Sequence, residues 1–149
     1  MPRKRKQKEP IHEHYVVRVG DWEYSYGLSP GVGHFDSRAY SEIQTLTFEG
    51  DLYQPADTKY SKGKITLSGD VDLLSHDLDD APTIIGTVNG RDDLLDFYVF
   101  IPAERLSELV TVASAGDVKV IAMGGEKLKW RKGRILNLHL STEFDEDEY

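Results

Sequence analysis

The residues of this chain most suited to chemistry are its histidines, because an imidazole can bind a metal ion or transfer a proton near neutral pH. Four of the five have a carboxylate within two residues: His12 and His14 with Glu13, His34 with Asp36, and His76 with Asp77. At strand spacing His12 and His14 would point to the same side, as two metal ligands need. A metal-dependent hydrolase built from these pairs is one interpretation. No known signature links them, so no metal and no cofactor is assigned.

Other routes to catalysis find less support in the sequence. The acidic residues Asp70, Asp72, Asp77, Asp79 and Asp80 could supply oxygens to Ca²⁺ but lack the spacing of an EF-hand loop, so a solvated strand face is favoured. There is no Gly-x-Ser-x-Gly element, and Gly31-Val32-Gly33 lacks the rest of a phosphate-binding loop. The absence of cysteine excludes disulfides and cysteine nucleophiles. The sequence therefore predicts no catalytic residue.

The clearest candidate for a binding surface is the basic stretch KLKWRKGR. If it is a strand with Leu128 and Trp130 pointing inward, its cations form an exposed stripe about 13 Å long, at about 3.3 Å per residue. The candidate binding residues are Lys127, Lys129, Trp130, Arg131, Lys132 and Arg134. Such a stripe could follow a phosphate backbone with Trp130 stacked on a base. It could equally pair with an acidic protein partner or the chain's own acidic residues, or protect a strand edge from aggregation.

Charge is distributed unevenly along the chain, which carries a formal net charge of −8. Five basic residues lie in the first ten, and five acidic residues lie between Glu143 and Glu148. We therefore expect a disordered basic arm (residues 1–11), a single β-rich domain (12–142) and a disordered acidic tail (143–149). The acidic body disfavours indiscriminate binding to nucleic acid, because like charges repel.

Period-two alternation of apolar residues predicts most of the secondary structure. Tyr15, Val17 and Val19 alternate in odd positions and Trp22, Tyr24, Tyr26 and Leu28 in even ones, so Gly20-Asp21 indicates a hairpin or a bulge. Further strands are expected from Glu42 to Tyr53, from Lys64 to Leu73, from Thr83 to Val88 and from Leu94 to Ile101. Asn89-Gly90 predicts the hairpin between the last two.

One helix and a long final strand complete the prediction. Pro102 suits a helix start, and Leu106, Leu109, Val110 and Ala113 form one apolar stripe, which predicts an α-helix at about residues 102–114. After a strand from Asp117 to Met123 and a turn at Gly124-Gly125, the even-numbered leucines favour one bent strand over residues 127–142. A hairpin at Lys132-Gly133 is the alternative. The predicted fold is mainly β: an antiparallel β-sandwich, or a partly closed barrel, of about eight strands with one α-helix.

The functional prediction follows from these elements. No apolar run is long enough to span a membrane, and the first residues lack the apolar segment typical of a signal peptide, so a cytoplasmic location is expected. The segments WEYSYG, IPAERL and GEKLKWRKGRI are similar to those of small bacterial proteins. We expect a non-catalytic interaction module that binds a protein partner or self-associates as a homo-oligomer. A nucleic-acid-binding protein that uses the basic arm and the Lys127–Arg134 stripe is the alternative, and the metal-dependent hydrolase is the second alternative.

Overall fold

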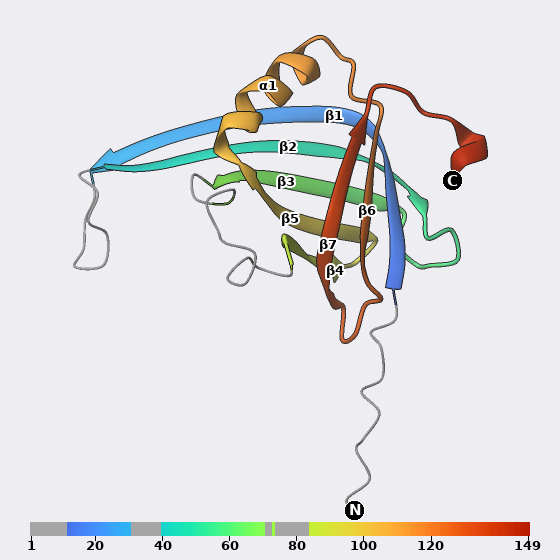
Figure 1. Ribbon diagram of the computed structural model, residues 1–149. Helices are drawn as coiled ribbons and strands as arrows, with labels where there is room; N and C mark the ends of the chain where they lie inside the picture. Colours follow the sequence, from blue (N-terminus) through green and yellow to red (C-terminus); the bar gives the residue numbers. More distant parts are fainter. Residues whose placement is uncertain (1–11, 31–39, 71–72, 74–83) are drawn as a thin grey trace, which may run out of the picture.

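The computed structural model describes residues 12–30, 40–70, 73 and 84–149 (Figure 1). The described residues form seven strands, one α-helix and a short 3₁₀ helix. Their bounds are β1 (His12–Pro30), β2 (Tyr40–Gln54), β3 (Lys62–Asp70), β4 (Gly86–Arg91), β5 (Leu94–Pro102), α1 (Ala103–Ser114), β6 (Val120–Glu126), β7 (Lys132–Ser141) and η2 (Glu146–Glu148). The basic arm, residues 1–11, lies outside the described residues.

The strands form one sheet that closes on itself in the order β1-β2-β3-β5-β4-β7-β6, with β6 paired back to β1. Neighbouring strands are antiparallel except β3 and β5, which run parallel from Lys62 beside Leu94 to Asp70 beside Pro102. The closed sheet and its single helix confirm the predicted fold class. The helix begins one residue later than predicted and ends at Ser114, as predicted.

The core lies inside the ring because alternate residues of each strand point inward. Its fully buried side chains include Tyr15 and Val17 of β1, Leu46 and Phe48 of β2, Ile65 and Leu67 of β3, Phe97 and Val99 of β5, and Ile121 and Met123 of β6. Helix α1 lies across one end of the ring (Figure 1) and adds Leu106 and Ala113 to this core. Gly69 allows the helix to approach, since a Cβ there would lie 3.2 Å from Ala103 Cα.

A β-bulge in β1 explains the change of parity in the sequence. Val19 is paired with Gly50 and Asp21 with Glu49, which leaves Gly20 as the extra residue. A bulge shifts the alternation by one residue. The odd-numbered apolar residues before Gly20 and the even-numbered ones after it therefore lie on the same face of β1.

At two places where glycines predicted a turn, the glycines lie within strands. Gly124 and Gly125 belong to β6, where the Gly124 amide donates to Asn137 Oδ1 at 2.7 Å and a Cβ would lie 2.6 Å from Asn137 Nδ2. The predicted hairpin between β4 and β5 is confirmed, but it turns at Asp92-Asp93 rather than at Asn89-Gly90. Gly90 instead leaves room for the Tyr60 ring. These glycines permit close packing within the sheet rather than chain reversal.

The C-terminal segment is placed against the outside of the ring. Phe144 and Tyr149 pack against Val16, Val120 and Ala122, and the two rings stack with centroids 6.0 Å apart. The Arg18 guanidinium lies 5.4 Å from the centre of the Phe144 ring. Phe144 and Tyr149 thus supply the contacts of the acidic C-terminal segment with β1 and β6.

Within the described ranges, no helix has the length and apolar character needed to cross a membrane.

The glycines of β1 and β2 allow a test of how closely the strands pack. At Gly50 a Cβ would run into the carbonyl group of Arg18, whereas at Gly27 it would meet nothing within 4 Å. We expect Gly50→Ala to lower the free energy of unfolding by about 2 kcal/mol, because the strands must separate to admit the methyl group. Gly27→Ala should change it by less than about 0.5 kcal/mol. Urea unfolding measures both, and equal midpoints would contradict the packing described.

Candidate functional site

The six candidate binding residues lie at the tip of the hairpin between β6 and β7. β6 ends at Glu126 and β7 begins at Lys132. The backbones of Lys129 and Lys132 exchange two hydrogen bonds, of 2.8 and 3.1 Å, which enclose the turn residues Trp130 and Arg131. The predicted bent strand over residues 127–142 is therefore wrong, as is the alternative turn at Lys132-Gly133.

The even-numbered leucines misled the prediction because a bulge also lies in β7. Asn137 is paired with Gly124 and Ile135 with Gly125, which leaves Leu136 as the extra residue. Ile135 points into the core before the bulge, and Leu138 and Leu140 pack against it after the bulge. The common parity of the leucines thus does not reflect one continuous strand.

The turn has an unusual composition for its conformation. Trp130 and Arg131 have φ angles of 54° and 66°, so both occupy the left-handed region. Hairpins favour two-residue turns with positive φ at both positions, usually as Asn-Gly, because their twist matches that of the strands. Side chains larger than hydrogen make this conformation cost about 1–2 kcal/mol per residue. The sequence therefore lacked the usual signal for a turn, and the fold holds two large residues in a costly conformation.

The hairpin tip exposes Trp130 instead of burying it. The Trp130 side chain is 88% exposed, whereas Leu128 is partly buried and packs against the core. The predicted inward orientation is thus correct for Leu128 and wrong for Trp130. Lys127, Lys129, Arg131 and Lys132 are also exposed and flank the indole along the chain. The cations gather at a tip rather than forming a stripe along a strand.

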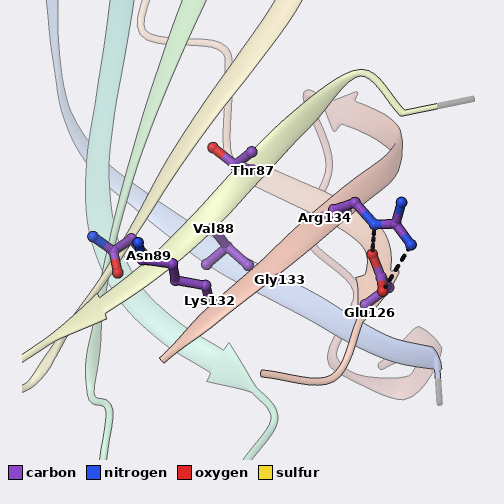
Figure 2. A pocket seen from close by; sticks show the side chains of 7 residues that line it. All are labelled: Thr87, Val88, Asn89, Glu126, Lys132, Gly133 and Arg134. Atoms are coloured by element: carbon purple, nitrogen blue, oxygen red, sulfur yellow. Dashed lines mark hydrogen bonds and ion pairs between the residues drawn. The ribbon is translucent and has the colours of Figure 1, made fainter. Parts of the chain in front are cut away.

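One of the candidate cations is already paired. Arg134 donates to both carboxylate oxygens of Glu126, with Nη2 3.3 Å from Oε2 (Figure 2). This hydrogen bonding lowers the pKa of the Glu126 carboxyl and raises the pKa of the Arg134 guanidinium. Among the described residues the other four cations have no ion pair within 4.0 Å. We define the basic tip as Lys127, Lys129, Trp130, Arg131 and Lys132.

Two surface pockets adjoin the basic tip. The first, of about 490 Å³, contains the Glu126–Arg134 pair and is completed by Thr87, Val88, Asn89, Lys132 and Gly133 (Figure 2). Its only carboxylate is already engaged with Arg134, and neither it nor the Thr87 hydroxyl forms part of a nucleophile–base pair. The first pocket thus offers polar contacts but no assembled reaction centre.

The second pocket, of about 320 Å³, lies between the basic tip and residues 55–60. Its charged residues are Glu13, Asp57, Lys59, Lys127 and Arg131. Tyr15 also lines it, and its hydroxyl donates to the Glu126 carbonyl at 2.7 Å. Burial raises the pKa of the Tyr15 phenol, so the hydroxyl stays protonated and acts as a structural donor.

The histidine and aspartate hypotheses fall mainly outside the described residues. His12 and His14 are exposed on β1, and the His14 ring stacks on Tyr149 at 6.2 Å. The residues of these hypotheses that lie outside the described ranges are His34, Asp36, Asp72, His76, Asp77, Asp79 and Asp80. Within the described ranges no three histidine, aspartate or glutamate side chains form a group that could hold a metal ion.

A second candidate surface lies on the hairpin formed by β1 and β2, which extends to the left past α1 and β3 in Figure 1. We call residues 20–30 and 40–44 the projecting hairpin. Trp22, Tyr24, Tyr26 and Leu28 are 37, 38, 51 and 59% exposed. They lie opposite Phe48, Leu46, Gln44 and Glu42, and therefore share one face. We call these four residues the apolar face. It continues the core face of the sheet beyond the point where the core ends.

Hydrogen bonds fix the two tyrosines of the apolar face. The Tyr26 hydroxyl donates to Glu42 Oε2 at 2.8 Å, and Gln44 Nε2 donates to the Tyr24 hydroxyl at 3.0 Å. The bond to Glu42 raises the pKa of the Tyr26 phenol. These cross-strand bonds order the rings without covering them, so the face is organised before any partner arrives.

A separate aromatic pair, Tyr98 and Phe100, lies on the opposite face of the sheet. Both rings are about 40% exposed, and they meet edge to face with centroids 5.3 Å apart. Because Phe97 and Val99 point into the core, their neighbours in the strand point outward. This pair is not part of the apolar face and provides a natural control for it.

The alternation from Trp22 to Leu28 predicted a strand but did not mark these residues as a site. The sequence feature that indicates their exposure lies in β2, the strand opposite them. There the inward positions change from apolar, at Phe48 and Leu46, to polar, at Gln44 and Glu42. That change marks where the core ends, but it can be read only once the register of the two strands is known.

Comparisons with protein-family models, with curated proteins and with solved structures found no match for this chain.

Proposed function

We propose that this protein is a non-catalytic interaction module that self-associates through the apolar face of the projecting hairpin. One observation carries the proposal: four large apolar side chains lie side by side on one face of a hairpin that extends beyond the body. Single exposed apolar residues are ordinary, but a continuous row of them marks an interaction site.

The composition of the apolar face suits a protein contact. Tyrosine and tryptophan are enriched at interfaces because they bury a large area with few rotatable bonds. Each aromatic side chain can bury about 150–250 Å², at about 25 cal/mol per Å² of apolar surface removed from water. The face carries no cation, and the Glu42 carboxylate beside it already accepts a hydrogen bond from Tyr26. Two copies of the face can therefore meet without bringing unpaired cations together.

The molar mass of the protein in solution, measured over a range of concentrations, tests this proposal directly. We expect the wild-type protein to change from monomer to dimer with rising concentration, because contact between two copies removes part of the exposed apolar surface from water. Tyr24→Ser/Leu28→Ser should weaken this association at least about tenfold, as loss of roughly 1.4 kcal/mol requires. Sedimentation equilibrium measures the dimer dissociation constants of the wild-type protein and of the double variant.

Tyr98→Ser is the matched control, because it removes an equally exposed aromatic ring from the opposite face of the sheet. It should leave the association unchanged. The proposal is wrong if wild-type protein remains monomeric, or if Tyr98→Ser weakens association as much as the double variant.

The basic tip supports a second candidate function, the binding of single-stranded nucleic acid. Trp130 is 88% exposed and is flanked in sequence by four cations without ion pairs among the described residues. An exposed indole can stack on a base while neighbouring cations contact phosphates. The net charge of −8 opposes this binding over the rest of the surface.

Salt dependence would identify such binding. If all four cations contact phosphates, the logarithm of the binding constant should fall with a slope of about −3 against the logarithm of salt concentration. Lys127→Ala/Lys129→Ala should make this slope shallower by about 1.4. Fluorescence anisotropy with a labelled oligonucleotide measures it.

Trp130→Asn/Arg131→Gly supplies a folding control, because Asn-Gly fits the turn and should raise stability by about 1–2 kcal/mol. It should nevertheless weaken binding, because it removes the stacking of Trp130 and the phosphate contact of Arg131. A truncation that lacks residues 1–10 separates the contribution of the basic arm. No binding at micromolar protein in low salt would eliminate this candidate function.

A further inference from the structure

The long edge of the projecting hairpin belongs to β1. Pairing of β1 with β6 ends at Arg18 opposite Val120, and one further bond joins the Val19 amide to the Lys119 carbonyl at 2.9 Å. From Gly20 to Pro30, the described part of the chain provides β1 with β2 on one side and no strand on the other. In an antiparallel strand, alternate residues direct their N–H and C=O groups to each side. This edge therefore presents backbone donors and acceptors to an incoming strand.

The edge carries little of the protection that proteins usually give an open strand. Lysine, proline and bulges are the common means of preventing strands from pairing edge to edge. Between Asp21 and Ser29 there is no lysine, arginine or proline, and the only charged side chains are the carboxylates of Asp21 and Glu23. The bulge at Gly20 and Pro30 lie at the two ends of this segment. They limit strand pairing to the residues between them and do not block it there.

We infer that residues 21–29 of β1 pair antiparallel with the same residues of a second copy, around a two-fold axis at Ser25. This inference rests on the proposed self-association and specifies its geometry: the apolar faces of the two copies join side by side into one larger face and do not stack on each other. The two hairpins would form a continuous four-stranded sheet in the order β2-β1-β1-β2. A two-fold arrangement closes the assembly at two copies, since each edge is consumed by the other.

The segment is self-complementary in this register. Ser25 is the midpoint of the open edge, so centring the pairing there uses its whole length. On the apolar face Trp22 lies opposite Leu28 of the second copy, and Tyr24 lies opposite its Tyr26. On the other face both carboxylates meet uncharged residues: Asp21 lies opposite Ser29, and Glu23 lies opposite Gly27.

Neighbouring registers are worse for identifiable reasons. Moving the axis by half a residue places the aromatic residues of one copy opposite polar residues of the other, because the side-chain period is two. Moving the axis to Glu23 brings two glutamates directly opposite each other, which is destabilising. Moving the axis to Tyr24 or Tyr26 still places the apolar residues of both copies on the same face of the sheet, but fewer of residues 21–29 are then paired.

Trp22 also lies beside a pocket of about 150 Å³ that is lined in part by Phe48, Ala113 and Val118. In the inferred register, Leu28 of the second copy lies next to this pocket. An apolar contact would then be added at each end of the paired segment. A contact made by one nine-residue strand segment is small beside a standard interface of roughly 800 Å² per partner, so we expect a weak, concentration-dependent association.

Introduced cysteines test the register, since the chain has none of its own. Opposite residues of antiparallel strands have Cα atoms about 4.5–5.5 Å apart, within the range that a disulfide spans. Ser25→Cys should therefore form a disulfide-linked dimer under mild oxidation. In Glu23→Cys the two cysteines would be about 13 Å apart and should not cross-link. We expect at least a tenfold difference in dimer yield on non-reducing gels.

A mixed experiment supplies the matched positive control. Glu23→Cys and Gly27→Cys should each cross-link poorly alone but should form a mixed dimer when combined, because residue 23 lies opposite residue 27. All three positions are exposed on the projecting hairpin, so folding should be retained, and urea unfolding verifies this.

The outcomes separate the inference from the proposed function. If the wild-type protein dimerises through the apolar face but Ser25→Cys cross-links no better than Glu23→Cys, the edge pairing is wrong and the self-association stands. If the wild-type protein is monomeric at all concentrations, both are wrong. Selective cross-linking of Ser25→Cys and of the mixed pair supports both.

Discussion

The structure depends on one mismatch, which is that β1 is longer than the neighbour with which it closes the sheet. Its first half pairs with β6 and β2 and completes the ring, but beyond Val19 the described residues place only β2 beside it. The bulge at Gly20 keeps the apolar residues of both halves on the same face. Consequently an inward-facing row that begins in the core at Tyr15 and Val17 continues into solvent at Tyr24, Tyr26 and Leu28. The exposed apolar face and the open strand edge have this single cause.

Helix α1 limits how far the core can extend along the hairpin. It packs against β2, β3 and β5, where Leu106 and Ala113 close the end of the ring. Trp22 lies beside the C-terminal end of this helix, and the residues that follow it become progressively more exposed toward Leu28. The ring and α1 thus stabilise the part of the projecting hairpin near Trp22 and leave the apolar face of its outer part uncovered among the described residues. A two-stranded ribbon alone is marginally stable, so a covering partner would also stabilise the hairpin.

Local patterns in the sequence were sufficient for much of the fold. Apolar alternation located the strands and indicated a hairpin or a bulge at Gly20, and the apolar stripe located α1, because both depend on residues near one another in the chain. Glycine was less informative, since Gly90 and Gly124 serve packing against Tyr60 and Asn137. The turn at Trp130-Arg131 could not be predicted from residue preferences, because neither residue favours positive φ. Predicting the exposure of the apolar face required the register between β1 and β2, which is a long-range property.

The central claim is that the open edge of β1 is covered by a second copy, and backbone amide exchange measures this most directly. In dilute protein, amides of residues 21–29 that face the open edge should exchange rapidly, because no strand among the described residues pairs with this edge. At concentrations that favour the dimer these amides should become protected, while amides of β6 keep the same rate. Exchange of residues 21–29 that is independent of concentration, in protein whose mass shows a dimer, would contradict the account.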